Sequence, residues 1–192
     1  AIRLYSPSTR LFYAASSHIF GTPFNDLQDE STPINPLSIY GITKATGLFL
    51  CRSYRKSYGL YAAVGILYNH ESIYRSENFI SAKIIRSALR IKRAEQDQLI
   101  VGDLNAVADW GYAPDYVNAM KKILELSEPD DFVIATGEKH TVREFVEIVF
   151  KELDLVWENL VEERGYVLTR QSSVLIGNSD KLRVKTGWKP TV

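Results

Sequence analysis

The stretch Leu60-Tyr61-Ala62-Ala63-Val64-Gly65-Ile66-Leu67-Tyr68 has little polarity, and it predicts a strand that is buried on both faces. A helical pattern precedes it at residues 38–58, which begins at Ser38, a favoured N-cap residue, and stops at Gly59. Another short apolar run, Leu11-Phe12-Tyr13-Ala14-Ala15, comes before that helix. Strand, helix and strand in this order predict a parallel sheet and therefore an α/β fold.

The rest of the chain continues this alternation. Helices are expected at residues 77–93, 114–127, 141–153 and 179–186, and extended segments at residues 99–101, 106–110 and 132–135. The apolar residues expected to face inward on helix 77–93 are Phe79, Ile80, Ile84, Ala88 and Leu89. Residues 21–36 and 69–76 are rich in polar and turn-forming residues, and we expect them to be loops.

The composition is typical of a globular protein. Of the 192 residues 45% are hydrophobic, and 23 basic and 23 acidic residues give a net charge of zero, which argues against nucleic acid as the main partner. No apolar run approaches the roughly 20 residues that span a membrane. One cysteine, Cys51, and three histidines argue against a structural metal site. No secretory signal is visible, so the cytoplasm is the expected location.

Tyr40 and Lys44 lie four residues apart near the start of helix 38–58, so their side chains share one helical face. A cation close to a phenol favours the phenolate, which makes Tyr40 a candidate proton acceptor. Ser16 and His18 follow the first strand, and the carboxyl ends of parallel strands are where such sheets bind ligands. Because Tyr-x-x-x-Lys matches often by chance, its interpretation depends on the surrounding motifs.

Several short motifs occur in a characteristic order along nearly the whole chain. They include Ser16-Ser17-His18-Ile19-Phe20-Gly21, Tyr40-Gly41-Ile42-Thr43-Lys44, Asn69-His70-Glu71-Ser72, Asp109-Trp110-Gly111, Asp115-Tyr116-Val117 and Gly187-Trp188-Lys189-Pro190. With these motifs the chain resembles the extended short-chain dehydrogenase/reductases, and among them the GDP-mannose 4,6-dehydratase family. The Asn-His-Glu-Ser segment is the most specific marker of that branch.

The resemblance implies one incomplete domain, made of the C-terminal half of a Rossmann-type parallel sheet and a small α/β substrate-binding portion. The Rossmann elements correspond roughly to residues 1–76 and 106–136, and the substrate-binding portion roughly to residues 77–105 and 137–192. In the family, a Gly-rich phosphate loop lies in the first strand-turn-helix. This sequence has no counterpart of that loop, so we expect the chain by itself to be impaired.

The resemblance also implies a chemistry. In the dehydratases, a tyrosine takes the proton of the sugar 4-hydroxyl while hydride passes from C4 to NADP. An acid/base residue then takes the C5 proton, water leaves from C6, and the hydride returns there. Tyr40 matches the tyrosine, Lys44 matches the lysine that supports it and holds the nicotinamide ribose, and Ser16 matches a threonine that bonds the reacting hydroxyl. The remaining matches are cofactor contacts at His70 and Arg75, and substrate contacts at Asn69 and Arg170.

Three positions depart from the family pattern. His18 stands where the dehydratases have the glutamate that acts on C5, and an imidazole also exchanges protons near neutral pH. The dehydration step is therefore the one that this substitution affects. Ala108 replaces an arginine expected to contact the diphosphate, and Ser173 replaces a glutamate that faces the nucleotide.

Three hypotheses follow. The chain is a nucleotide-sugar 4,6-dehydratase-like protein that binds a GDP-hexose and NADP, or a non-catalytic fragment that serves as a binding or interaction module. The third is a keto-sugar reductase or epimerase in which His18 has a new role. Because the strand at residues 11–15 would form an apolar sheet edge, we also expect a homo-oligomer or a partner that covers this edge and helix 38–58.

Overall fold

The computed structural model describes residues 1–165 and 174–192, and within them the chain forms two compact units. Unit 1 comprises Ala1–His70, Asp109–Glu138 and Leu175–Val192, and unit 2 comprises Glu71–Ala108 and Lys139–Val174. This division differs from the predicted one at the C-terminus. Leu175–Val192, expected in the substrate-binding portion, belongs to the unit that contains the main sheet.

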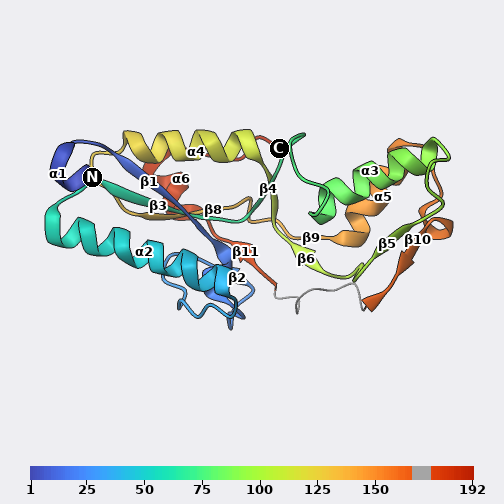
Figure 1. Cartoon of the computed structure of the whole chain (residues 1–192), viewed down its shortest axis with the longest axis horizontal. Coiled ribbons are helices and arrows are strands. Elements are labelled where there is room, and N and C mark those ends of the chain that lie inside the picture. The colour runs from blue at the N-terminus through green and yellow to red at the C-terminus, as the bar shows by residue number, and fades with distance from the viewer. Residues whose placement is uncertain (166–173) are drawn as a thin grey trace. The chain divides into compact units, whose positions relative to one another are not determined.

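Unit 1 is built on a three-stranded parallel sheet in the order β1-β3-β8 (Figure 1). Its strands are β1 (Leu11–Ser16), β3 (Ala62–Leu67) and β8 (Asp131–Ile134). In β1 and β3, Leu11 lies opposite Ala62, and Ser16 lies opposite Leu67. The apolar runs of the sequence thus form the buried strands that they predict, and the α/β fold with a parallel sheet is confirmed.

Helix α2 (Ile39–Tyr58) connects β1 to β3 and has the limits that the sequence predicts. At its start the Ser38 hydroxyl accepts a hydrogen bond from the Gly41 N–H at 3.0 Å, which satisfies one of the free donors of the first turn. At its end Gly59 has a φ of 62°, a left-handed conformation that favours glycine, and its N–H bonds the Arg55 carbonyl.

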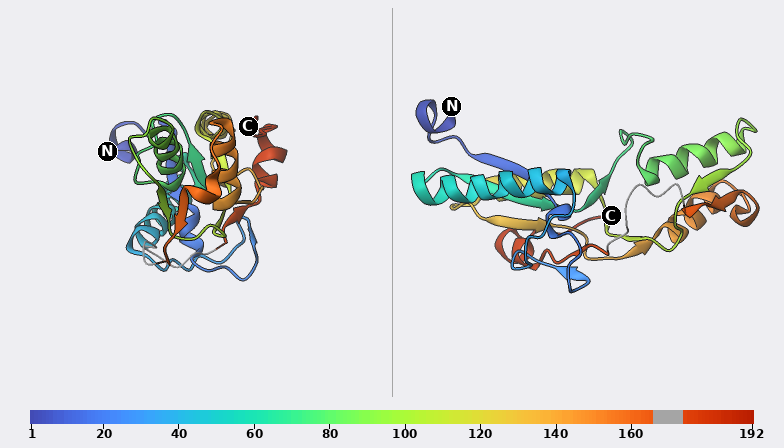
Figure 2. Two further views of the ribbon diagram at one scale, coloured as in Figure 1. Left: turned by 90° about the vertical axis from the view of Figure 1, so that its right-hand side faces the viewer. Right: turned by 60° about the horizontal axis from the view of Figure 1, so that its bottom comes forward.

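Helices cover both faces of this sheet (Figure 2). Successive side chains of a strand point to opposite faces, so Val64 and Ile66 pack against α2 while Ala63 and Leu67 pack on the other side. The helices of that second side are α4 (Ala113–Glu125) and α6 (Asp180–Thr186). Both faces of the sheet are therefore covered by apolar side chains, and polar side chains that could contact a ligand are expected at the ends of the strands.

Two short ladders occur where the sequence predicts loops. β2 (Leu27–Gln28) pairs in parallel with β11 (Ile176–Gly177), and β4 (Asn69–Glu71) pairs with β7 (Trp110–Tyr112). The loop prediction for residues 21–36 and 69–76 was wrong at these positions. Strands of two or three residues have no recognisable alternation, and they form here because a distant segment supplies the partner.

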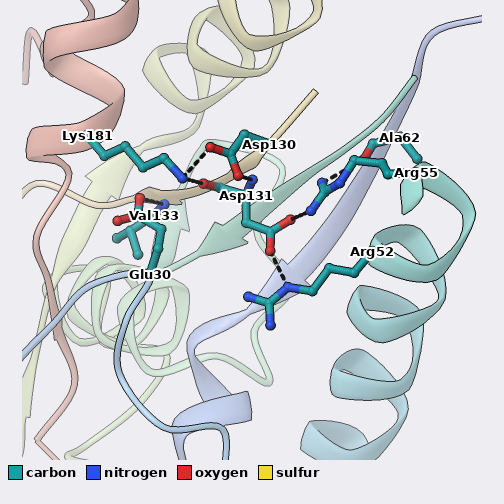
Figure 3. A network of polar contacts seen from close by, with 8 residues as sticks. All are labelled: Glu30, Arg52, Arg55, Ala62, Asp130, Asp131, Val133 and Lys181. Atoms are coloured by element: carbon teal, nitrogen blue, oxygen red, sulfur yellow. Dashed lines mark hydrogen bonds and ion pairs between the residues drawn. The ribbon is translucent and has the colours of Figure 1, made fainter. Parts of the chain in front are cut away.

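A charged network ties α2 to the amino ends of β3 and β8 (Figure 3). The Asp131 carboxylate is almost fully buried, and it accepts hydrogen bonds from Arg52 Nε at 2.5 Å and Arg55 Nη2 at 2.7 Å. Arg55 also donates from Nη1 to the Ala62 carbonyl at 2.8 Å. The two arginines lie three residues apart on α2, so one helical face carries both.

Side chains also close the outer edge of β8 (Figure 3). Glu30 Oε1 accepts a hydrogen bond from the Val133 N–H at 2.7 Å, Lys181 Nζ donates to the Asp131 carbonyl at 2.9 Å, and Ser179 Oγ donates to the Ala135 carbonyl at 3.2 Å. Three of the backbone groups with which a further strand would pair are therefore already bonded.

The described part of unit 2 contains two α-helices and two short ladders. They are α3 (Ile80–Lys92), α5 (Val142–Glu152), the parallel pair β5 (Leu99–Val101) and β10 (Val161–Glu163), and the antiparallel pair β6 (Val107–Ala108) and β9 (His140–Thr141). Helix α5 begins with a capping box. Thr141 Oγ1 accepts from the Glu144 N–H at 3.1 Å, and the Glu144 carboxylate accepts from the Thr141 N–H at 2.7 Å.

The buried face of α3 differs from the predicted one. Ile84 is fully buried as expected, but Phe79 and Leu89 are 47% and 37% exposed. Ser81 and Ser87 are buried in their place. Small hydroxyl side chains count as polar in a hydrophobic pattern, so they shift the predicted face around the helix although they fit a tight interface.

The remaining described elements are α1 (Ile2–Tyr5), η1 (Ser17–Phe20) and η2 (Trp157–Asn159). Among the helices of residues 1–165 and 174–192, none combines the length and apolar character needed to cross a membrane.

Candidate active site

Polar side chains gather where β1 ends and α2 begins. Ser16 is the last residue of β1 and the N-cap of η1, and its hydroxyl accepts a hydrogen bond from the His18 N–H at 3.3 Å. Gly41 lets the first turn of α2 approach this segment, because a Cβ at that position would lie 2.6 Å from the His18 carbonyl oxygen. The sequence-predicted residues Ser16, His18 and Tyr40 therefore meet at the carboxyl edge of the sheet.

The Tyr40 ring lies against His18. Their ring centroids are 5.7 Å apart at an interplanar angle of 81°, an edge-to-face arrangement. Tyr40 is 53% exposed, so much of this residue is in contact with solvent. The predicted base and the residue that departs from the family pattern are thus direct neighbours.

Lys44 lies on the same face of α2 as Tyr40, as the spacing predicts. Its ammonium nitrogen lies 5.7 Å from the Tyr40 ring centroid and donates a hydrogen bond to the Ala14 carbonyl at 2.8 Å. Ala14 belongs to β1, so the lysine bridges the helix to the strand. This position keeps a positive charge beside the phenol.

Tyr13 is a neighbour of the site that the motif analysis missed. Its ring centroid lies 5.6 Å from Lys44 Nζ, on a residue whose side chain faces α2. A Cβ at Gly47 would lie 2.1 Å from this ring, so the glycine makes room for it. Burial, followed by the charges of Cys51 and Tyr40, raises the pKa of Tyr13. The signal in the sequence was the strand alternation, which puts Tyr13 and Ala15 on the helix-facing side.

Asn69 and His70 lie just beyond the end of β3, in the same unit. Asn69 Nδ2 donates to the Asp109 carbonyl at 3.3 Å, and His70 Nδ1 lies 2.8 Å from the Tyr68 carbonyl oxygen. Both side chains are half-buried. The predicted substrate contact and the predicted cofactor contact are therefore tied to the backbone of unit 1.

Asp109 organises the surrounding backbone although sequence reasoning gave it no role beyond a motif. Its side chain is fully buried. The carboxylate accepts hydrogen bonds from the Thr136 N–H and hydroxyl, the Gly137 N–H and the Gly177 N–H, at 2.7 to 3.2 Å. A buried carboxylate is tolerated because four donors satisfy it.

Arg75 belongs to unit 2, where neighbouring side chains orient its guanidinium. Nε lies 3.1 Å from Glu71 Oε2, and the guanidinium lies 3.5 Å above the Phe79 ring. Ser81 Oγ donates to the same Glu71 oxygen at 2.7 Å. Within residues 1–165 and 174–192 no hydrogen bond or ion pair of the two Nη atoms is recorded, and a guanidinium fork suits an anion such as a phosphate. The other predicted contact, Arg170, and the departure at Ser173 lie outside the described residues.

Comparisons with solved structures identify the fold that this arrangement belongs to. The structure of RMD from Pseudomonas aeruginosa complexed with NADPH superposes with a TM-score of 0.86 at 23% identity, covering 96% of this chain and 62% of that one. A dTDP-glucose 4,6-dehydratase of Bacillus anthracis in complex with NAD gives a TM-score of 0.86 at 22% identity, covering 100% and 59%. The fold is thus that of the Rossmann-type dehydratases and epimerases.

Sequence relatives narrow the class to one family. The family described as GDP-mannose 4,6 dehydratase matches residues 1–192. GDP-mannose 4,6 dehydratase 1 of Arabidopsis thaliana is 43% identical over 185 residues, covering 95% of this chain and 51% of the relative. The human GDP-mannose 4,6 dehydratase is 38% identical, covering 96% and 55%. The chain belongs to the GDP-mannose 4,6-dehydratase family, and it spans about half the length of these relatives.

Proposed function

We propose that the chain provides the base-carrying part of a nucleotide-sugar active site that takes a GDP-hexose together with NADP. One observation carries the proposal: Ser16, Tyr40 and Lys44 meet at the carboxyl end of β1, with the lysine charge beside the phenol. Family membership supports the choice of substrate, and the NADPH named for one structural neighbour supports the choice of cofactor.

In the proposed reaction Tyr40 removes the proton of a sugar hydroxyl, and Ser16 donates a hydrogen bond to the same oxygen. The Lys44 charge stabilises the phenolate that accepts the proton. Lys44 also holds the nicotinamide ribose, while His70 and Arg75 contact other parts of the dinucleotide. When bound, NADP supplies the hydride acceptor. Asn69 and Arg170 are the proposed contacts to the substrate diphosphate.

The residues of this chain fit that cofactor in part. Lys44 and His70 offer hydrogen-bonding atoms near the strand ends, and Arg75 offers a guanidinium group that suits a phosphate. Positioning of the cofactor contributes much of the catalysis in such enzymes. We therefore propose that the 192-residue polypeptide by itself binds NADP weakly and turns over slowly.

Calorimetric titration with NADP⁺ and with GDP-mannose tests the binding half of the proposal. Measurable binding of either ligand is expected, and Lys44→Ala should weaken NADP⁺ binding about ten- to a hundredfold, since a hydrogen bond to a charged group contributes about 1.5–3 kcal/mol. Lys56→Ala removes an exposed lysine from the same helix and is the matched control. If neither ligand binds the wild-type chain, the non-catalytic binding or interaction module is the better account.

His18 favours a second candidate function, a keto-sugar reductase or epimerase. The imidazole stands beside Tyr40, where the dehydratases have their C5 acid/base, and it offers a proton donor without a carboxylate. His18→Glu restores the family residue. Under the dehydratase proposal this variant forms more 4-keto-6-deoxy product from GDP-mannose than wild type does. If wild type reduces or epimerises a 4-keto sugar and His18→Glu abolishes that activity, the second candidate is correct.

We also propose that the outer edge of β1 and the adjacent face of α2 are covered by a second copy or another partner. Exposed apolar side chains on and beside α2 support this, and they include Ile39, Ile42, Phe49 and Leu50. Analytical ultracentrifugation at micromolar concentration should show an oligomer, and Leu11→Lys should dissociate it. Val184→Lys, at an 82% exposed site on α6, is the control. A wild-type monomer would contradict this proposal.

A further inference from the structure

His70 has one of its two ring nitrogens committed within unit 1. Nδ1 lies 2.8 Å from the Tyr68 carbonyl oxygen. A carbonyl oxygen can only accept a hydrogen bond, so Nδ1 carries the proton. In the neutral imidazole Nε2 is then an acceptor, and it is the remaining hydrogen-bonding atom of the ring.

Tyr116 fixes the plane of the same imidazole. The His70 and Tyr116 rings are stacked, with centroids 4.9 Å apart and an interplanar angle of 25°. Trp188 meets the Tyr116 ring edge-on at 6.4 Å, and a Cβ at Gly111 would lie 2.4 Å from it. Tyr116 is fully buried between these neighbours. The Tyr116 ring therefore has little rotational freedom, and stacking on it limits the rotation of the His70 imidazole.

The hydroxyl of Tyr116 does not explain why a tyrosine occupies this site. It is buried and has no hydrogen-bond partner among the described residues. Burial, followed by the charge of Asp109, raises the pKa of this phenol and keeps it neutral. A buried unpaired hydroxyl is unfavourable. What the side chain contributes is the flat ring beneath His70.

We propose that the Tyr116 ring and the Tyr68 carbonyl are positioning elements, which hold His70 as its Nδ1–H tautomer and present Nε2 as a hydrogen-bond acceptor. The ligand group that fits is an N–H or O–H donor on the dinucleotide, such as a carboxamide or a ribose hydroxyl. Only this choice of ligand rests on the proposed function. If His70 already is the Nδ1–H tautomer in the free protein, binding does not have to pay for a change of tautomer, and Nε2 is ready to accept a hydrogen bond from the ligand.

Long-range ¹H–¹⁵N NMR spectra of the labelled chain test the tautomer without any ligand. The spectra are recorded well above the ordinary imidazole pKa of about 6.5. His70→Asn identifies the His70 signals among the three histidines. Nδ1 should resonate as a protonated nitrogen and Nε2 as an unprotonated one. The Nε2–H tautomer, or a mixture of the two, would overturn the proposal.

Variants separate the ring of Tyr116 from general stability. Tyr116→Phe keeps the stack, so it should preserve the single tautomer and leave the thermal midpoint unchanged or higher. Tyr116→Leu removes the stack and should give a mixture of tautomers. Tyr61→Leu is the matched control, because Tyr61 lies near the opposite end of β3, roughly 20 Å away. If Tyr61→Leu also mixes the tautomers, or if Tyr116→Leu stays folded with a single tautomer, Tyr116 has no positioning role.

Binding experiments then address the ligand. NADP⁺ and nicotinic acid adenine dinucleotide phosphate differ in the carboxamide donor. Tyr116→Leu should weaken NADP⁺ binding about two- to tenfold, the range expected for one hydrogen bond. A lower affinity of the acid analogue for wild type assigns the donor to the carboxamide, and equal affinities assign it to a hydroxyl. If wild type binds neither dinucleotide, the cofactor assignment is wrong while the NMR result still decides the tautomer.

Discussion

The two edge strands of the sheet in unit 1, β8 and β1, differ in how their outward backbone groups are bonded. On β8 the outward backbone groups of residues 131, 133 and 135 are bonded by Lys181, Glu30 and Ser179. On β1 the outward groups include those of Phe12 and Ala14, because Leu11 already bonds Tyr61 on the β3 side and neighbouring residues alternate. Within the described residues, the Ala14 carbonyl is the one of these groups that has a partner, Lys44.

The two edges therefore differ in whether a further strand can pair with them: β8 ends the sheet, whereas β1 can be extended. At β8, polar side chains from two separate segments, residue 30 and residues 179–181, make further pairing unfavourable. At β1, the partner of the outer edge is the candidate active-site lysine itself. A strand added to β1 would offer its own N–H to the Ala14 carbonyl and compete with Lys44. The open edge and the site are therefore linked through one carbonyl group.

The largest expected effect concerns the closed side, at Asp131. Asp131→Ala leaves the guanidinium groups of Arg52 and Arg55 without their shared partner. Arg52 is 39% exposed and Arg55 keeps its bond to the Ala62 carbonyl, so we expect a loss of about 3 kcal/mol of unfolding free energy, since a hydrogen bond to a charged group contributes about 1.5–3 kcal/mol. Asp130→Ala removes the more exposed ion pair with Lys181 and should cost about 1 kcal/mol or less. Urea unfolding followed by circular dichroism measures both. Equal costs would show that the Asp131 network does not fasten α2 to the sheet.

Substitution of Glu30 should have the next largest effect on stability. Glu30→Ala leaves the Val133 N–H unpaired at the β8 edge, which costs about 1–3 kcal/mol, while Glu30→Gln keeps an acceptor and should cost much less. Unfolding midpoints of the two variants provide the measurement. A Gln variant as unstable as the Ala variant would mean that the charge, and not the hydrogen bond, closes this edge.

The same residue predicts a pH dependence. Burial raises the pKa of Glu30, and this outweighs the lowering by the Val133 hydrogen bond. The folded state therefore holds the proton to higher pH than the unfolded state, so the contribution of Glu30 to stability falls as pH rises from the unfolded pKa through the folded one. The stability of Glu30→Gln relative to wild type should therefore fall as the pH is lowered through that window, because only wild type gains from protonation. A relative stability that rises as the pH is lowered would contradict the assigned direction.

Gly47→Ala, on α2 beside β1, should have a smaller effect on stability, and the sign of this effect should depend on Tyr13. Gly47→Ala places a Cβ within 2.1 Å of the Tyr13 ring, and the overpacking should outweigh the roughly 1 kcal/mol gain in helix propensity. In a Tyr13→Ala background the same change should stabilise the protein by about 1 kcal/mol. Thermal unfolding of the four proteins in this cycle gives the answer. Additive effects would show that Tyr13 does not pack α2 against β1.

Hydrogen exchange compares the two edges directly and is the most local measurement. The Val133 amide should be protected in wild type and lose protection in Glu30→Ala, while the Phe12 and Ala14 amides of a monomeric sample exchange early. Oligomer formation should protect the latter two. Early exchange at Val133 in wild type would remove the contrast between the edges.

Much of the fold could be predicted because its signals are local. The limits of α2 follow from Ser38 and Gly59, and the capping box at Thr141 acts within one turn of α5. The buried face of α3 could not be predicted in the same way, because Ser81 and Ser87 are buried there while Phe79 is exposed. Which side of a helix meets its neighbour depends on the neighbour, which the helix sequence does not contain.

The candidate site likewise contains some contacts that local sequence predicts and others that it does not. That Tyr40 and Lys44 share a helical face follows from their spacing alone, since residues at i and i+4 are neighbours in any α-helix. Three other contacts depend on the folded chain: Lys44 bonds a β1 carbonyl, Asp109 accepts hydrogen bonds from amides 27 to 68 residues away, and His70 stacks on Tyr116. The difference arises because contacts within a helical turn need only the local chain. Strand ends and stacked rings meet only after the hydrophobic cores on both faces of the sheet have formed.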